Sequence, residues 1–164
     1  GGLAHLDAVS VHPYPNYNKP PESAAKEYRQ LRALIDRHAP RGRTLPILSG
    51  EWGYASHARG VSLDTQAAFA ARQQLANLLE GIPLSIWYDW KNDGPDPAER
   101  EHNFGLVTHD LQPKPAYLAL ATLARELPPE TAAAFAALAH RIGRTLRAAV
   151  VERATLDGGV PKLR

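Results

Sequence analysis

Glu51 is the residue of greatest chemical interest in the sequence, and its setting is unusual. It lies in the stretch TLPILSGEWGYAS, residues 44–56, where a short apolar run predicts a buried strand and ends in Ser-Gly. Trp52 follows the carboxylate directly. A single glutamate at the end of a strand is most often an ordinary ion-pair or helix-dipole partner, so a catalytic interpretation depends on what else lies near it.

Two more clusters of polar and aromatic residues follow β-prone runs. His12 and Tyr14 come directly after the run at residues 6–11, which stops before Pro13. The sequence Trp-Tyr-Asp-Trp, residues 87–90, ends the run that begins at residue 83. The predicted helices carry mostly Ala, Leu, Arg and Gln. The residues that could do chemistry are therefore segregated to the ends of three predicted strands.

Two predicted helices separate these strands, and a third follows them. Apolar residues recur at helical spacing in residues 24–38 and 68–82, and Pro113 is expected to open a helix that extends to residue 127. Strands and helices that alternate in this way favour an α/β fold with a parallel sheet. Loops at the carboxyl ends of parallel strands lie on one side of the sheet, so we expect the three clusters on a single rim.

A carboxylate among Trp, Tyr and His side chains suits the chemistry of sugars. Aromatic faces cover the apolar C–H face of a sugar ring, while amide, carboxylate and imidazole groups bond its hydroxyls. In glycoside hydrolysis one carboxylate attacks the anomeric carbon or activates a water, and a second carboxyl group protonates the leaving oxygen. Glu51 fits the attacking group, Gly50 permits a close approach, and Tyr14 could donate a hydrogen bond that favours the charged carboxylate.

The composition is that of a globular domain and does not favour a nucleic-acid-binding or membrane-spanning protein. The chain has 164 residues, of which 44% are hydrophobic and 22% charged, as in one ordinary globular domain. A formal net charge of +2 gives no argument for a nucleic-acid partner, and no apolar run is long enough for a membrane span. The sequence has no Cys, so the redox compartment stays undetermined. It starts Gly-Gly-Leu and contains no Met, so we expect a processed product or a fragment of a longer protein.

No metal or other cofactor is expected. The stretch DWKNDG at residues 89–94 resembles the start of a calcium loop. However, Lys91 occupies a ligand position, and Arg100 stands where the closing glutamate is required. The HExxH, phosphate-loop and GxSxG patterns are absent from the sequence.

Residues 6–127 resemble the second half of a clan A glycoside hydrolase, a retaining enzyme on a (β/α)8 barrel. SVHPY is similar to the end of strand 6 in these families, PILSGEWGY to strand 7, IPLSIWYDWKNDGPDPAEREHNFGLV to strand 8 and its loop, and LQPKPAYLALATL to the last barrel helix. The resemblance is to the family 39 type and its family 5 relatives, especially bacterial polysaccharide endoglycosidases. It implies a partial (β/α)8 TIM barrel in residues 1–128, followed by a helical or poorly ordered tail in residues 129–164.

The resemblance also implies roles for individual residues. Glu51 would be the catalytic nucleophile, with His12 and Tyr14 positioning it. Trp87 would form the sugar platform unless it only packs inside the barrel, and Trp52 and Trp90 are expected to be half-exposed beside the cleft. The predicted substrate-binding residues are His12, Tyr14, Trp52, Trp87, Asp89, Trp90, Asn92 and Asp93. An extracellular or periplasmic location is favoured by the resemblance only.

The acid/base residue of these families is missing from the chain. In the families it is a glutamate at the end of strand 4, typically after an asparagine, and this sequence has no Asn-Glu pair. Glu99 and Glu101, on the loop after the third strand, are not expected to replace it. A complete barrel needs about 250 residues. We therefore expect the isolated chain to be inactive on a carbohydrate substrate without the missing half of the barrel.

Two alternatives to a hydrolase fragment stay open. The chain could be a non-catalytic or degenerate module that binds glycans through Trp87 and Trp90. It could also be a half barrel that pairs with its missing half or with another copy, because unpaired strand edges favour association. The Arg-rich tail fits a solvated helix that covers apolar surface better than a helix on a membrane surface.

Overall fold

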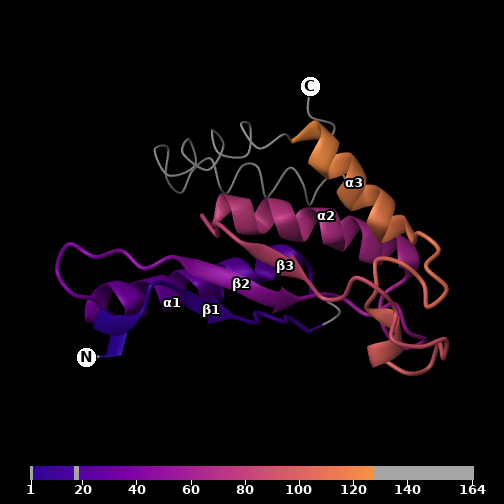
Figure 1. The fold of residues 1–164 in the computed structure, drawn as a ribbon, viewed down its shortest axis with the longest axis horizontal. Coiled ribbons are helices and arrows are strands. Elements are labelled where there is room, and N and C mark those ends of the chain that lie inside the picture. Colours follow the sequence, from indigo (N-terminus) through magenta and orange to yellow (C-terminus); the bar gives the residue numbers. More distant parts are fainter. Residues whose placement is uncertain (1, 17–18, 128–164) are drawn as a thin grey trace.

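The computed structural model describes residues 2–16 and 19–127 of the chain, and within them one small sheet is covered by helices (Figure 1). The parallel strands pair in the order β1 (Val9–Val11), β2 (Ile47–Trp52) and β3 (Ser85–Trp87). The helices are α1 (Ala25–His38), α2 (Leu63–Leu79) and α3 (Pro115–Glu126), with short 3-10 helices at Gly2–His5, Pro21–Ala24 and Glu101–Asn103. The predicted α/β fold with a small parallel sheet is confirmed.

Some parts of the sequence-based prediction are not tested by this architecture. The assignment of β1, β2 and β3 to strands 6–8 of a barrel stays a prediction. The predicted tail at residues 129–164, and the division placed at residue 128, lie outside the described residues. None of the helices in residues 2–16 and 19–127 combines the length and the continuous apolar character that a bilayer crossing requires.

The start of α2 is set by a side-chain cap. Ser62 is the N-cap residue, and its Oγ accepts a hydrogen bond from the backbone N–H of Thr65 at 3.1 Å. Asp64 in the first turn suits the positive end of the helix dipole. The helix ends before Gly81, which has a φ of +69°, so Ile82 lies beyond the helix although its spacing predicted a place on the helical stripe.

The last described helix begins two residues later than predicted. Pro113 pairs with Val107 in an isolated antiparallel bridge and does not open the helix. Pro115 does so instead, in the first turn, where a missing backbone N–H costs nothing. Lys114 is then the N-cap residue, and it becomes important below.

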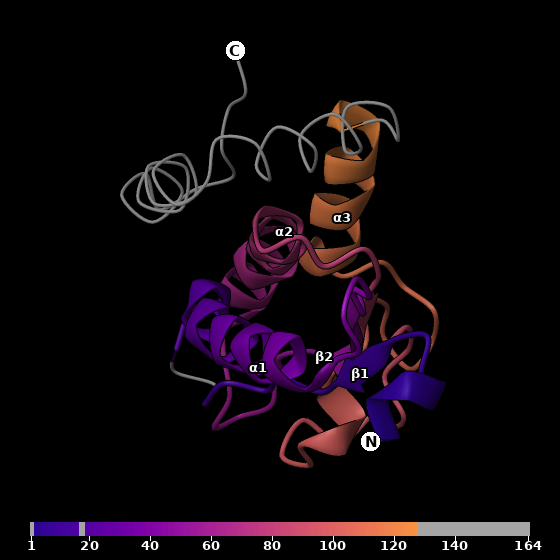
Figure 2. The ribbon, with the colours of Figure 1, turned by 90° about the vertical axis from the view of Figure 1, so that its left-hand side faces the viewer.

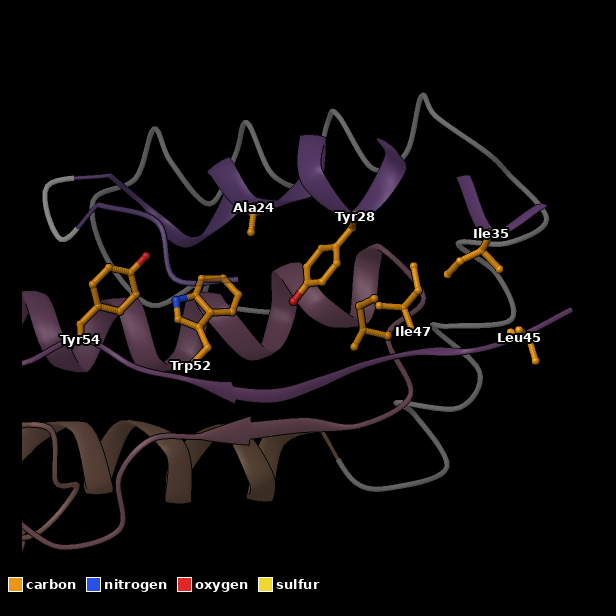
Figure 3. Packing of buried hydrophobic residues seen from close by; sticks show 8 residues of the cluster. Ala24, Tyr28, Ile35, Leu45, Ile47, Trp52 and Tyr54 are labelled. Atoms are coloured by element: carbon orange, nitrogen blue, oxygen red, sulfur yellow. The ribbon is translucent and has the colours of Figure 1, made fainter. Parts of the chain in front are cut away.

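The main core lies between the sheet and two helices (Figure 3). Tyr28 and Ile35 of α1 pack with Ile47 and Trp52 of β2 and with Tyr54, which follows the strand. Polar groups in this layer pair with one another. The Tyr28 hydroxyl donates to the Asn77 amide oxygen of α2 at 2.9 Å, and the Asn77 amide donates to Ser85 Oγ of β3 at 2.7 Å. These bonds fix α1, α2 and β3 in relation to one another.

A nearly buried ion pair joins α2 to the 3-10 helix that precedes α1. The Arg72 guanidinium donates two hydrogen bonds of 2.8 Å to the two carboxylate oxygens of Glu22. The side chains are only 14% and 9% exposed, so solvent screens this pair poorly. It holds Pro21–Ala24 against α2 and thereby fixes the approach to α1.

The other face of the sheet is open within the described residues. Figure 2 shows α1 and α2 on one side of the strands, with α3 packed against α2. Side chains alternate along a strand, and Leu84 and Ile86, which point away from Asn77 and the helices, are each 46% exposed. Among the described residues β1 and β3 also each leave one edge unpaired. Parallel sheets are normally covered on both faces, so this arrangement is typical of part of a barrel.

Candidate functional site

Glu51 reaches the rim because β2 contains one extra residue. The register pairs Ser49 with Ser85, but the next pair is Trp52 with Trp87, so three steps on β2 match two steps on β3. This β-bulge lets both Ser49 and Trp52 face the helices, where each is 0% exposed. Without the bulge, strict alternation from Ser49 would turn Glu51 toward the helices. With it, the Glu51 side chain is 39% exposed at the carboxyl end of the strand.

Tyr14 and His12 both lie at this carboxylate, as expected from the sequence. The Tyr14 hydroxyl donates a 2.7 Å hydrogen bond to Glu51 Oε1, which confirms the donor that the sequence suggested. His12 Nδ1 lies 3.9 Å from the other oxygen, Oε2. Burial raises the pKa of Tyr14 above its ordinary value, and the hydrogen bond to Glu51 adds to the increase. The phenol therefore remains protonated and stays a donor at neutral pH.

Gly50 is required by the neighbouring strand. A Cβ at this position would collide with Ser10 Oγ and would lie 3.5 Å from His12 Nε2. The glycine thus lets β1 approach β2 closely enough to bring His12 to the carboxylate. The sequence predicted that Gly50 permits a close approach to the nucleophile. In this structure the groups that approach Gly50 are side chains of the protein itself, those of Ser10 and His12.

Phe104 and Tyr88 belong to the site, although sequence analysis gave neither residue a role. The Phe104 ring is 2% exposed and lies edge-on to Tyr14 at 6.4 Å and to Tyr88 at 5.2 Å between centroids. Burial raises the pKa of Tyr88, and nearby carboxylates that include Glu101 and Glu51 raise it further. Tyr88 could have been singled out from its place in the Trp-Tyr-Asp-Trp cluster. Phe104 comes from a distant loop and carries no local signal.

The tryptophan predictions require correction. Trp52 is fully buried in the core rather than half-exposed beside a cleft, because the bulge turns it toward α1 and α2. Trp87 also faces the helices, where it packs on Tyr54 and its Nε1–H donates to the Phe104 carbonyl at 3.2 Å. The packing alternative considered for Trp87 is therefore favoured over a sugar platform. Trp90 is 56% exposed, as expected, and its ring contacts Tyr117 of α3 on the helical side.

The predicted groove residues after β3 differ from one another. Asp93 is exposed, and the partly exposed Asp89 accepts a hydrogen bond from the backbone N–H of Trp90. Asn92 is only 9% exposed, and its Oδ1 accepts a hydrogen bond from Lys114 Nζ at 3.3 Å. Its Oδ1 is therefore directed to this buried contact, and the role of Asn92 in a substrate groove stays a prediction.

Lys114 is a buried cation that sequence analysis did not identify. It is 4% exposed, and its Nζ donates to Ser56 Oγ at 3.1 Å, to Asn92 Oδ1 and to the Asn103 carbonyl at 3.2 Å. These acceptors come from the loops that follow β2 and β3, so one ammonium group ties both loops to the start of α3. All three acceptors are neutral, and burial lowers the pKa of Lys114 to about 8.

A pocket adjoins the Tyr14 side of the site. It has a volume of about 370 Å³, and its walls include Tyr14, Tyr54, His57, Arg100 and Phe104. Tyr14 thus both lines the pocket and donates a hydrogen bond to Glu51, which is not a lining residue. Within residues 2–16 and 19–127, no three potential His, Asp or Glu ligands lie close enough together to hold a metal ion.

Comparison with known proteins places this geometry in context. No family model matches the sequence, and no curated protein matches it. Solved structures do match. A family 39 glycoside hydrolase from the gut symbiont Bacteroides cellulosilyticus WH2 has a TM-score of 0.70 and 29% identity over 78% of this chain. GH5_18 from Streptomyces cattleya, solved in complex with GlcNAc, has a TM-score of 0.54 and 25% identity over 76% of the chain.

The chain is similar to part of a glycoside hydrolase. A GH2 beta-galacturonidase from Eisenbergiella tayi, at 22% identity over 74% of this chain and a TM-score of 0.56, shares the fold. The chain spans only 29%, 32% and 24% of the lengths of these three proteins. It therefore corresponds to less than a third of each of these three glycoside hydrolases.

Proposed function

We propose that this chain supplies the nucleophile, Glu51, of a retaining glycoside hydrolase. The observation that carries the proposal is the 2.7 Å hydrogen bond from Tyr14 to Glu51 Oε1 at the carboxyl end of β2. A nucleophilic carboxylate must be ionised, held in one orientation and open to substrate. The phenol donor holds one carboxylate oxygen in place, while the side chain stays 39% exposed.

In the proposed reaction a Glu51 oxygen forms a bond to the anomeric carbon of the sugar. The bond from that carbon to the leaving-group oxygen breaks, and this oxygen takes a proton from a second carboxyl group. Water then hydrolyses the glycosyl ester and releases Glu51 unchanged. His12, 3.9 Å from Oε2, would help to orient the carboxylate, and Tyr14 would keep its hydrogen bond to Oε1 throughout.

We assign the second carboxyl group to the part of the barrel that this chain does not span. The sequence has no Asn-Glu pair, and the chain covers only 29% and 32% of the family 39 and GH5_18 hydrolases that it matches. The isolated chain would then form the glycosyl ester only from a substrate whose leaving group needs no protonation. The proposal places its natural substrate among poly- or oligosaccharides.

The proposal is tested by mass spectrometry of the chain after incubation with dinitrophenyl 2-deoxy-2-fluoroglycosides. These reagents have a leaving group that departs without an acid, and the fluorine slows hydrolysis of the ester. A panel of gluco, galacto, xylo and glucurono configurations covers the unknown sugar. We expect one added glycosyl mass on the peptide that contains Glu51, and no added mass in Glu51→Gln.

Two outcomes would contradict the proposal. One is an adduct that persists in Glu51→Gln, because another nucleophile would then be responsible. The other is a folded chain that takes no adduct from any member of the panel. If that chain still bound glycans, the result would favour the alternative of a non-catalytic binding module.

A further inference from the structure

We propose that the pocket beside Tyr14, called here the Arg100 pocket, binds an anionic group of the glycan, such as a hexuronate carboxylate or a sugar sulfate. The inference rests on the proposed function for its sugar context and specifies the substrate class. The pocket is about 370 Å³, near the lower end of the range for ligand pockets, which suits one sugar ring and its substituent. Tyr14, one of its lining residues, donates the hydrogen bond to Glu51 and so connects the pocket to the candidate nucleophile.

Arg100 is held in place without being neutralised. Its guanidinium carbon lies 4.9 Å from the centroid of the buried Phe104 ring, a cation–π contact that fixes the plane of the side chain. Its only carboxylate partner among the described residues is Glu101, at a long 3.4 Å from Nη1. Both side chains of that pair are about half exposed, so their attraction is weak. The Nε and Nη2 donors have no acceptor within the part of the chain that the structure describes.

The rest of the wall adds no opposing charge. His57 lines the pocket, but its Nδ1 is buried against Gly60 and does not face the pocket. The described lining contains neither Asp nor Glu. Tyr14 and Tyr54 supply aromatic wall. A neutral sugar would leave the Arg100 donors without a matching charge, whereas a carboxylate or sulfate would accept two parallel hydrogen bonds from the guanidinium.

The nearby carboxylates do not line the pocket. Glu51 is not a lining residue, although its Oε1 accepts the hydrogen bond of the lining residue Tyr14. Glu101, the ion-pair partner of Arg100, is half-exposed and is not a lining residue either. A substrate anion in the pocket would therefore face Arg100 without a carboxylate among the described lining residues.

The test is an NMR titration of the full 15N-labelled chain with small methyl glycosides. The anionic probes are methyl β-glucuronide, methyl β-galacturonide and methyl β-glucoside 6-sulfate, and the neutral probes are methyl β-glucoside and methyl β-galactoside. We expect at least one anionic probe to bind with a Kd roughly tenfold below that of its neutral counterpart, the size expected for a charged hydrogen bond. A preference for the uronides would identify a carboxylate as the group that the pocket binds, and a preference for the 6-sulfate would identify a sulfate ester.

Matched variants locate the effect. Arg100→Gln is expected to remove the difference between anionic and neutral probes, and Arg100→Lys to keep part of it. Arg37→Gln is the control, because it deletes an exposed arginine of α1 that does not line the pocket. Equal affinity of the wild type for anionic and neutral probes would overturn the proposal. So would an anionic preference that survives Arg100→Gln or is lost in Arg37→Gln.

Failure of this inference can be told apart from failure of the proposed function. Labelling of Glu51 without any anionic preference would overturn the Arg100 pocket and leave the nucleophile in place. An anionic preference that depends on Arg100, in a chain that takes no covalent adduct, would support the pocket and contradict the nucleophile assignment.

Discussion

The Tyr14 hydroxyl donates a 2.7 Å hydrogen bond to Glu51 across 37 positions of the sequence. This bond joins the loop after β1 to the end of β2, and it gives the site its first measurable consequence. Tyr14→Phe removes the hydroxyl that donates to Glu51 Oε1. Because the carboxylate would lose the contact that holds one of its oxygens in position for attack, we expect Glu51 to be labelled by an activated 2-fluoroglycoside roughly tenfold more slowly.

Tyr117→Phe serves as the control for the loss of a phenol. Tyr117 lies on α3 and packs against Trp90 rather than against Glu51. Its labelling rate, followed by intact mass over time, is expected to match the wild type. Equal rates in Tyr14→Phe and the wild type would show that the hydrogen bond does not support the reaction.

Lys114 gives the chain a distinctive dependence of stability on pH. Its pKa is about 8 in the folded chain, and its ordinary value is 10.5. Between these values the unfolded chain holds a proton that the folded chain has released, so this group makes the free energy of unfolding rise with pH. Below pH 8 the folded chain carries the full cost of the buried charge, roughly 3 kcal/mol.

Urea denaturation at several values from pH 7 to pH 9.5 checks this expectation. The wild type should gain stability relative to Lys114→Met as the pH rises through 8, because the variant lacks the titrating group. The difference between the two proteins cancels the contribution of other groups that titrate in the same range, including the tyrosines. A difference that stays constant with pH would contradict the buried, uncompensated ammonium.

Gly50→Ala is expected to destabilise the chain by about 1 kcal/mol, because the colliding atom belongs to an exposed side chain that can change rotamer. The new Cβ would collide with Ser10 Oγ, which lies on the neighbouring strand. Ser10→Ala removes that oxygen and leaves the Ser10 Cβ at 3.6 Å, an ordinary contact. The double variant should therefore regain most of the lost stability. Thermal unfolding of the four proteins tests this cycle, and additive effects would rule out the collision as the cause.

The buried ion pair predicts a contrast between two glutamates. Glu22→Gln leaves the Arg72 guanidinium, only 14% exposed, without its charged partner, and a loss of about 3–5 kcal/mol is expected. Glu126→Gln breaks an ion pair with Arg125 whose side chains are 71% and 59% exposed, and a change below about 1 kcal/mol is expected. Chemical denaturation measures both. Similar losses in the two variants would show that burial does not set the strength of these pairs.

Much of the fold could be predicted because it follows from local patterns. Apolar runs that stop at polar clusters marked the strands, and helical spacing marked the helices between them. Alternation implies a parallel sheet with a shared rim, which brings His12, Tyr14 and Glu51 near one another. The Tyr14 donor could be suggested because a phenol that follows one strand shares this rim with the carboxylate that ends the next.

The errors arise where the outcome depends on contacts between distant segments. The bulge in β2 depends on pairing with β3, so period-two alternation could not show that Trp52 points into the core. Phe104 reaches the site through a loop whose path has no periodic signal. Lys114 looks like an ordinary solvated lysine in sequence, and only the two loops that close over it reveal a buried cation.

The extra residue in β2 also means that the pairing register of this strand, as well as its sequence, decides which side chains reach the site. If β2 paired with β3 without a bulge at its present length, Glu51 would oppose Trp87 and Trp52 would lie one step beyond that pair. Strict alternation from Ser49 would then turn the carboxylate toward the helices and the indole toward the open face of the sheet. A strand grafted with the same residues but paired one position out of register would therefore keep the sequence of the site and lose the orientation of its carboxylate.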